Sequence, residues 1–128
     1  MIPFIFVLQI IIMKKAYYLS TCSTCQKVLN QIKAPESFQM QDIKTSSITT
    51  EQIEEMKMLS GSYKSLFSKR AMKYRSLGLN DQNLGEEAYK KWILEEYTFL
   101  KRPVFIVKDK IFIGNSKKEI AAFLSEIQ

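Results

Sequence analysis

The stretch YYLSTCSTCQKVLNQI, residues 17–32, contains both cysteines of the chain, Cys22 and Cys25. The aromatic and apolar residues at its start, AYYLS at 16–20, predict a short buried strand. A helix is predicted to follow directly, because apolar residues then recur at helical spacing: Val28, Leu29 and Ile32. We therefore expect the first cysteine at the junction of strand and helix and the second cysteine one turn into the helix.

This placement predicts redox chemistry. Positions three apart at a helix start lie close enough for a disulfide, whose Cα atoms stand about 4.4–6.8 Å apart. The unpaired N–H groups and the helix dipole lower the pKa of Cys22 and make it a nucleophile, and Cys25, more shielded, would resolve the adduct by forming an internal disulfide. The alternative is two buried thiols that pack as small apolar groups. A C-x-x-C spacing beside a strand-helix unit favours the redox interpretation.

Composition sets broad limits. With 128 residues the chain has the length of one domain, and 46% hydrophobic and 25% charged residues are ordinary for a globular protein. The formal charge of +6 favours anionic partners. The chain has no histidine, which excludes Ser-His and Cys-His catalysis. Two cysteines without histidine also argue against a structural zinc site, so we expect no metal.

The first twelve residues, MIPFIFVLQIII, form an apolar run shorter than the roughly 18 residues that a bilayer span needs. Lys14 and Lys15 follow this run, whereas a signal peptide carries its positive charge before the apolar core. We expect a start assigned too early, with Met13 as the true initiator, and a domain over 13–128 after an extension at 1–12. A membrane-associated tail is the alternative, and no stable membrane span is expected.

The rest of the chain alternates strand and helix signals. In chain order we expect a strand at 37–43, a helix from 49 to Gly61, short helical pieces over 63–79, a helix at 86–97, a hairpin after Pro103 and a last helix from Ser116. Capping boxes are predicted for Thr49 with Gln52 and for Ser116 with Glu119. Strand-helix-strand at one end and hairpin-helix at the other predict an α/β fold with a mixed sheet.

The segment LKRPVFIV contains a second informative pair, Arg102 and Pro103. Proline is tolerated at the first residue of a strand, so one interpretation is a strand start beside a solvated arginine. The other is a cis proline facing the cysteines, with Arg102 placed to bind an anion or to lower the thiol pKa. The residues alone leave both open.

Together these features resemble the arsenate reductase (ArsC) family of the glutaredoxin-dependent type and its Spx-type regulator branch. The resemblance covers residues 14–127. It rests on the Y-x-x-x-x-C-x-x-C segment, on LFSKRAMKYRSLGL at 66–79, on RPV at 102–104 and on IGNSKKEIAAFL near the end. It implies a thioredoxin-like three-layer sandwich, with a mixed four-stranded sheet and a helical insertion.

The resemblance also implies roles for single residues. Cys22 matches the nucleophilic cysteine of the family, and Arg102 matches its oxyanion-binding arginine. Arsenate-reducing members carry another arginine where this chain has Ser68, followed by Lys69 and Arg70, which we expect to substitute in part. A third arginine is replaced here, at about Ile113 or Gly114. Each charge-assisted hydrogen bond is worth roughly 1.5–3 kcal/mol, so arsenate capture is expected to be weaker.

Two functions from different classes follow. The first is a cytoplasmic, monomeric thiol oxidoreductase that acts on arsenate, another small oxyanion or a disulfide. It would need no bound cofactor, because glutathione with glutaredoxin, or thioredoxin, would return the dithiol. The second is an Spx-type redox-sensing regulator that binds RNA polymerase. A basic cluster suits the second function, although it also fits an ordinary solvated helix face: Lys69, Arg70, Lys73 and Arg75.

Overall fold

The computed structural model describes residues 14–128, which form two compact units. The first unit contains the described residues up to Asp42 together with Arg102–Gln128, and the second unit is Ile43–Lys101. The expected extension at 1–12 and the expected initiator Met13 lie outside the described residues. The predicted domain boundary between residues 12 and 13 therefore stays a prediction.

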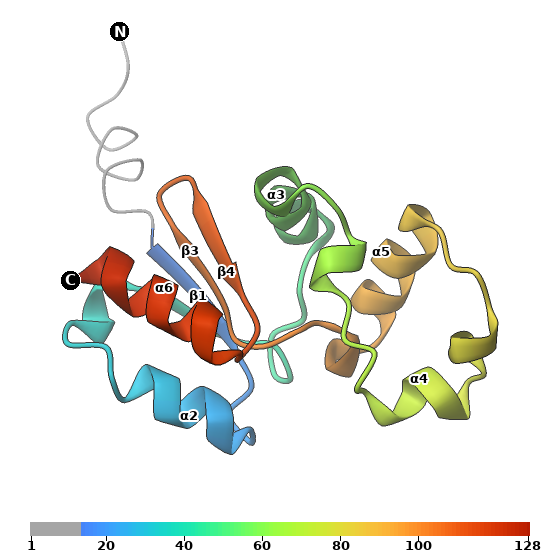
Figure 1. Ribbon diagram of the computed structural model, residues 1–128, viewed down its shortest axis with the longest axis horizontal. Coiled ribbons are helices and arrows are strands. Elements are labelled where there is room, and N and C mark those ends of the chain that lie inside the picture. Colours follow the sequence, from blue (N-terminus) through green and yellow to red (C-terminus); the bar gives the residue numbers. More distant parts are fainter. Residues whose placement is uncertain (1–13) are drawn as a thin grey trace, which may run out of the picture. The chain divides into compact units, whose positions relative to one another are not determined.

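The first unit is built on a four-stranded sheet (Figure 1). Its strands are β1 (Lys14–Tyr18), β2 (Gln39–Asp42), β3 (Val104–Val107) and β4 (Lys110–Ile113). They lie in the order β2-β1-β3-β4, with β1 parallel to β2 and antiparallel to β3, which is itself antiparallel to β4. The predicted α/β fold with a mixed sheet is confirmed.

The helices follow the predicted order along the chain. The first unit carries α2 (Ser23–Leu29) and α6 (Lys117–Ile127), and the second carries α3 (Thr50–Ser60), α4 (Met72–Ser76) and α5 (Glu86–Glu95). Short 3-10 turns lie at Pro35–Ser37, Lys64–Leu66, Leu79–Asp81 and Tyr97–Phe99. None of the helices in residues 14–128 is long and apolar enough to cross a membrane.

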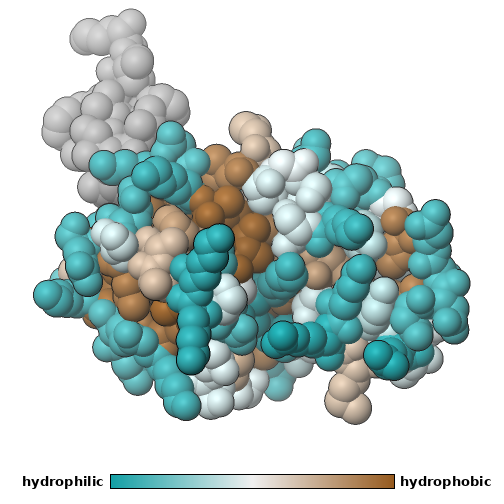
Figure 2. Space-filling view, in the orientation of Figure 1, coloured by the Kyte–Doolittle hydropathy of each residue, from teal (hydrophilic) through white to brown (hydrophobic). Residues whose placement is uncertain are grey.

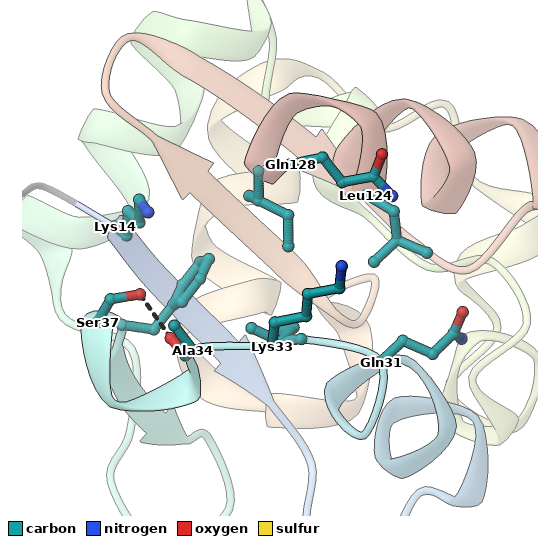
Figure 3. A pocket seen from close by; sticks show the side chains of 10 residues that line it. Lys14, Gln31, Lys33, Ala34, Ser37, Leu124 and Gln128 are labelled. Carbon is teal, nitrogen blue, oxygen red and sulfur yellow. Dashed lines mark hydrogen bonds between the residues drawn. The ribbon is translucent and has the colours of Figure 1, made fainter.

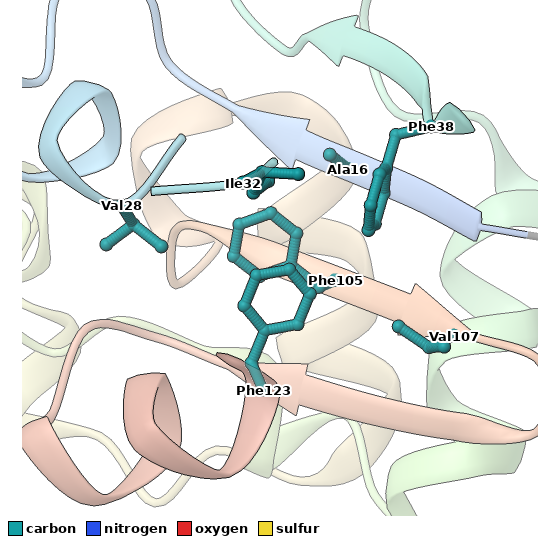
Figure 4. Close-up of a cluster of buried hydrophobic side chains, with 7 residues drawn as sticks. All are labelled: Ala16, Val28, Ile32, Phe38, Phe105, Val107 and Phe123. Atoms are coloured by element: carbon teal, nitrogen blue, oxygen red, sulfur yellow. The ribbon is translucent and has the colours of Figure 1, made fainter. Parts of the chain in front are cut away.

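A group of aromatic rings fixes α6 on the sheet (Figure 4). Phe123 of α6 stacks on Phe105 of β3 with ring centroids 3.8 Å apart, and Phe38, just before β2, meets both rings edge-on. Val28 of α2 belongs to the same buried cluster. Because residues on one face of β1 and β3 contact both helices, α2 and α6 cover the same face of the sheet.

The second unit has a core of its own around Phe67. Its ring lies 4.9 Å from those of Phe99 and Tyr89 and 5.7 Å from that of Tyr74, measured between centroids. Phe67 also forms a single antiparallel bridge with Leu100, near the end of the unit. The unit is thus a compact helical segment between β2 and β3, as expected for the helical insertion.

Several local predictions hold and three need correction. Thr49 and Gln52 form the full capping box, and Gly61 ends α3 with a φ of 96°. The first strand spans 14–18 rather than 16–20, since the Leu19 carbonyl already accepts the Cys22 N–H in a turn. The strand predicted at 37–43 spans only Gln39–Asp42, and in it Met40 is 42% exposed although the apolar pattern of the segment pairs it with buried Phe38.

The third correction concerns the start of α6. Ser116 Oγ accepts the N–H of Glu119, which is half of the predicted capping box. The other half is not formed as predicted, because the Glu119 carboxylate accepts the N–H of Ile113 in β4 instead. Among the described residues β4 is the last strand of the sheet, so the outward-facing N–H of Ile113 needs an acceptor, which the Glu119 carboxylate supplies.

Candidate thiol site

The two cysteines occupy the start of α2, where the sequence places them. Cys22 is the N-cap residue, with extended backbone angles (φ −93°, ψ 114°), and Cys25 lies in the first turn. Both are free thiols. Cys22 is partly exposed, whereas Cys25 is 0% exposed. The chain therefore presents one thiol to solvent and keeps the other beneath it.

The pKa of Cys22 is lowered, although several influences oppose one another. Partial burial raises it, because the thiolate loses contact with water. The N–H of Cys25, the Cys25 thiol and the N–H of Thr24 together outweigh burial, and the positive charge of Arg102 adds to them. The N–H groups of Thr24 and Cys25 stabilise the thiolate electrostatically, although the Cys22 side chain does not form the hydrogen bond of a standard N-cap. Cys22 is thus the thiol that ionises more readily than usual.

The pKa of Cys25 moves in the opposite direction, from its ordinary value of 9.0 to about 11. Burial is the largest cause. The N–H of Leu19 lowers the pKa, but the hydrogen bond to Cys22 and the negative charge on Cys22 raise it, and Arg102 compensates only in part. At neutral pH Cys25 is therefore a protonated thiol that donates toward Cys22.

Arg102 and Pro103 lie in the same unit as the cysteines. The bond between them is cis, as the second interpretation of this segment predicted. Pro103 is buried, and its carbonyl accepts the N–H of Gly114 at 2.9 Å. The positive charge of Arg102 lowers the pKa of both thiols, as the smallest of the influences on each.

Lys69 and Arg70 belong to the other unit. They are exposed and lie between buried Phe67 and the start of α4. Of the basic cluster, Lys73 forms an ion pair with Glu96, whose pKa is lowered mainly by that hydrogen bond. The predicted share of Lys69 and Arg70 in oxyanion binding stays a prediction.

The cysteines do not line either of the two hollows found among the described residues. One hollow, with about 430 Å³ of empty space open to solvent, lies between the end of α2, the turn before β2 and the end of α6 (Figure 3). Its wall includes Lys33, Phe38 and Leu124. A second hollow of about 400 Å³ lies in the other unit. Neither hollow therefore contributes to the thiol site.

A mixed four-stranded sheet with a C-x-x-C pair at its first helix and a cis proline before the hairpin defines a thioredoxin-like thiol protein. Residues 17–123 match the model of the ArsC family, and the chain belongs to that family. The global transcriptional regulator Spx 2 of Bacillus anthracis is 25% identical over 114 residues, 84% of each chain.

Solved structures show the same fold. An arsenate reductase from Vibrio cholerae superposes with a TM-score of 0.72 at 16% identity, over 90% of this chain and 97% of that one. An arsenate reductase-related protein from Brucella melitensis gives a TM-score of 0.65 at 17% identity, over 87% and 93%. The predicted family and thioredoxin-like fold are both confirmed.

The helix-start amides that lower the pKa of Cys22 were predicted, and those of Thr24 and Cys25 are the ones that act. Sequence reasoning missed the Leu19 amide, which acts on Cys25 and carries no side-chain signal, and the strand end behind Pro103. Gly114 had a signal, since glycine suits its φ of 86°, but its bond to Pro103 depends on strand register. For Glu119 the sequence predicted a helix cap and gave no sign of the hydrogen bond from Ile113.

Proposed function

We propose that this ArsC-family protein is a thiol-disulfide oxidoreductase, with Cys22 as nucleophile and Cys25 as resolving thiol. The observation that carries the proposal is the placement of two free thiols at the start of α2, one partly exposed and the other 0% exposed, and the opposite directions of their pKa shifts agree with it. The group that ionises readily is the one open to solvent, and the buried group stays protonated beside it. That is the distribution a stepwise exchange needs, since thiolate character and access decide which thiol attacks first.

The reaction with a disulfide substrate has two exchange steps. The Cys22 thiolate attacks one substrate sulfur, a mixed disulfide forms, and the other substrate sulfur leaves as a thiolate. Cys25 then loses its proton to solvent and attacks Cys22, which forms the Cys22–Cys25 disulfide and releases the second substrate thiol. An external thiol donor, such as glutathione with glutaredoxin or thioredoxin, supplies two electrons to restore the dithiol.

Conversion of Cys22 also prepares Cys25 for its step. Once Cys22 is in a mixed disulfide it carries no charge, so two of the influences that raise the pKa of Cys25 disappear. The Leu19 amide and the Arg102 charge, which lower it, remain. The buried thiol therefore becomes easier to ionise at the stage when it has to attack.

With arsenate the same residues would act on arsenic. Cys22 would displace an oxygen as water to form an S–As bond, and attack of Cys25 on the Cys22 sulfur would leave the bonding electrons on arsenic, reducing As(V) to As(III). In the first unit Arg102 is the cation that acts on Cys22. A single cation suits a disulfide or a weakly charged oxyanion better than a multiply charged one.

Coupled reduction of arsenate, and separately of bis(2-hydroxyethyl) disulfide, tests this function. Oxidation of NADPH is followed with glutathione, glutaredoxin and glutathione reductase in one series, and with thioredoxin and its reductase in another. We expect turnover of at least one substrate, its loss in Cys22→Ser, and trapped mixed disulfides in Cys25→Ser. Equal rates for the wild type and Cys22→Ser would contradict the proposal.

A regulator of the Spx type is the second candidate. The observation that favours it is the 25% identity to an Spx protein over 84% of both chains, joined to a C-x-x-C pair and the exposed cations Lys69 and Arg70. The disulfide would then act as a switch for binding RNA polymerase. Binding to purified polymerase from the source organism is measured with reduced and oxidised protein. Equal affinities, or none, would count against this role.

A further inference from the structure

Glu119, in the first turn of α6, uses its carboxylate to hold a strand. Its Oε2 accepts the N–H of Ile113 at 2.8 Å, while its own N–H donates to Ser116 Oγ at 3.1 Å. We propose that Glu119 is a positioning residue for the thiol site, acting through the end of β4 on the carbonyl of Pro103 and hence on Arg102. This role at the site rests on the proposed function of Cys22.

The first step is the register of the hairpin. The N–H of Gly114 donates to the carbonyl of Pro103, and Val104 lies opposite Ile113. Residue pairs along antiparallel strands are alternately hydrogen-bonded and non-hydrogen-bonded. Because Pro103 and Gly114 form a hydrogen-bonded pair, the next pair, Val104 with Ile113, is not hydrogen-bonded. The N–H of Ile113 therefore points away from β3.

The second step is the position of β4 in the sheet. It is the last strand in the order β2-β1-β3-β4, so no further strand within residues 14–128 accepts the Ile113 N–H. The strand is partly covered and apolar, and a hydrophobic patch lies over this hairpin in Figure 2. A main-chain N–H at such a place needs an acceptor, which Glu119 supplies.

The third step leads to the site. Pro103 has no N–H, so its carbonyl is the only main-chain group through which it can join the ladder, and Gly114 is its partner. The chain turns sharply at Gly114, with a φ of 86°, before it enters α6 at Ser116. By tying Ile113 to α6, Glu119 holds both sides of this turn and so the direction of the Gly114 N–H.

The last step is electrostatic. Arg102 precedes Pro103, and its charge acts on Cys22 together with the Cys25 thiol and the amides of Thr24 and Cys25. Loss of the Glu119 carboxylate frees the Ile113 N–H and lets the Pro103 carbonyl shift. Arg102 is then held less closely, and the Cys22 thiolate is less well stabilised.

The experiment compares five variants of the full chain: Glu119→Ala, Glu119→Gln, Ser116→Ala, Arg102→Gln and the double variant of Glu119→Ala with Arg102→Gln. Amide hydrogen exchange at Ile113 and Gly114 is measured by NMR, and the pH midpoint of Cys22 alkylation is measured in the reduced protein. Glutamine keeps an acceptor oxygen, so it serves as the conservative rescue. Ser116→Ala removes the helix cap at the same end of α6 but keeps the carboxylate, and it is the matched control.

We expect Glu119→Ala to speed exchange at both amides about tenfold or more, the factor that one hydrogen bond to a charged group is worth. It should slow Cys22 alkylation below the midpoint about two- to threefold, a rise of a few tenths in apparent pKa. Glu119→Gln should stay close to the wild type in both. Combined with Arg102→Gln, Glu119→Ala should cause no further change in the midpoint.

Unchanged exchange at Ile113 and Gly114 in Glu119→Ala would overturn the proposal. So would an equal shift of the alkylation midpoint in Ser116→Ala, which would indicate general loosening of α6, or a full shift in the Arg102→Gln background, which would exclude action through Arg102. None of these measurements needs a substrate. A failed turnover assay alongside the expected results would therefore count against the proposed function and leave the role of Glu119 intact.

Discussion

The two thiols should differ in reactivity by a factor that follows from the structure. At pH 7 a thiol with a pKa of about 11 is ionised in about one molecule in 10⁴, whereas a thiol at the ordinary value of 9.0 is ionised in about one in 100. The pKa of Cys22 lies below that value, so its thiolate is at least about a hundredfold more abundant than that of Cys25.

Nucleophilicity reduces this advantage and burial restores it. A thiolate of lower pKa attacks more slowly, by about tenfold for a two-unit difference at a Brønsted coefficient of 0.4–0.5. The net preference from ionisation is thus about tenfold. Cys25 is also 0% exposed, which excludes the reagent further. We therefore expect Cys22 to be alkylated at least about tenfold faster than Cys25.

The assay uses limiting iodoacetamide on the fully reduced protein at pH 7. The modified cysteine is located by fragmenting the peptide that contains both residues, at several reaction times. Protein unfolded in urea is the control, because the two thiols should then react at nearly equal rates. Rates within threefold of each other in the folded protein would refute the assignment of Cys22 as the nucleophile.

Three further predictions concern stability. Burial raises the pKa of Cys25 to about 11, so the folded state favours the protonated thiol. This contribution to stability is fully present below pH 9 and is lost as pH rises from 9 toward 11, by about 1–2 kcal/mol after allowance for solvent screening. Urea unfolding at several alkaline pH values under reducing conditions should show a shallower loss in Cys25→Ala than in the wild type, and equal slopes would contradict the shift. Phe123→Ala removes a ring stacked 3.8 Å from that of Phe105 and should lower the free energy of unfolding by about 3–5 kcal/mol, whereas exposed Ser125→Ala on the same helix should change it little. Thr49→Ala breaks the capping box of α3 and should cost about 1 kcal/mol in urea unfolding, while a cost as large in the neighbouring Thr50→Ala would argue against the cap.

How well the sequence predicted the site differs from one residue to another. The position of Cys22 and Cys25 was predictable, because a strand ending before Ser and Thr and a helix starting after them are local patterns. The cis bond before Pro103 remained one of two interpretations until the structure showed it. The partner of the Glu119 carboxylate was predicted incorrectly, since a helix cap and an edge-strand amide were both within its reach.

The sequence by itself determined the elements and the family. The start of α3 after Thr49 and its end at Gly61, the hairpin after Pro103 and the C-x-x-C pair all depend on residues a few positions apart, which interact in the same way wherever the segment lies. Membership of the ArsC family follows from the match of residues 17–123 to the family model.

Only the tertiary structure decided how the thiols behave and which side chains are covered. Three features depend on segments that are distant along the chain. They are the different exposure of Cys22 and Cys25, the effect of the Arg102 charge on the thiols, and the hydrogen bond from the Ile113 N–H to the Glu119 carboxylate. Desolvation and charge act through space, so the same C-x-x-C sequence can yield inert or reactive thiols. Burial and the hydrogen bonds around each thiol are the largest influences on the pair, and the positive charge of Arg102 adds to them.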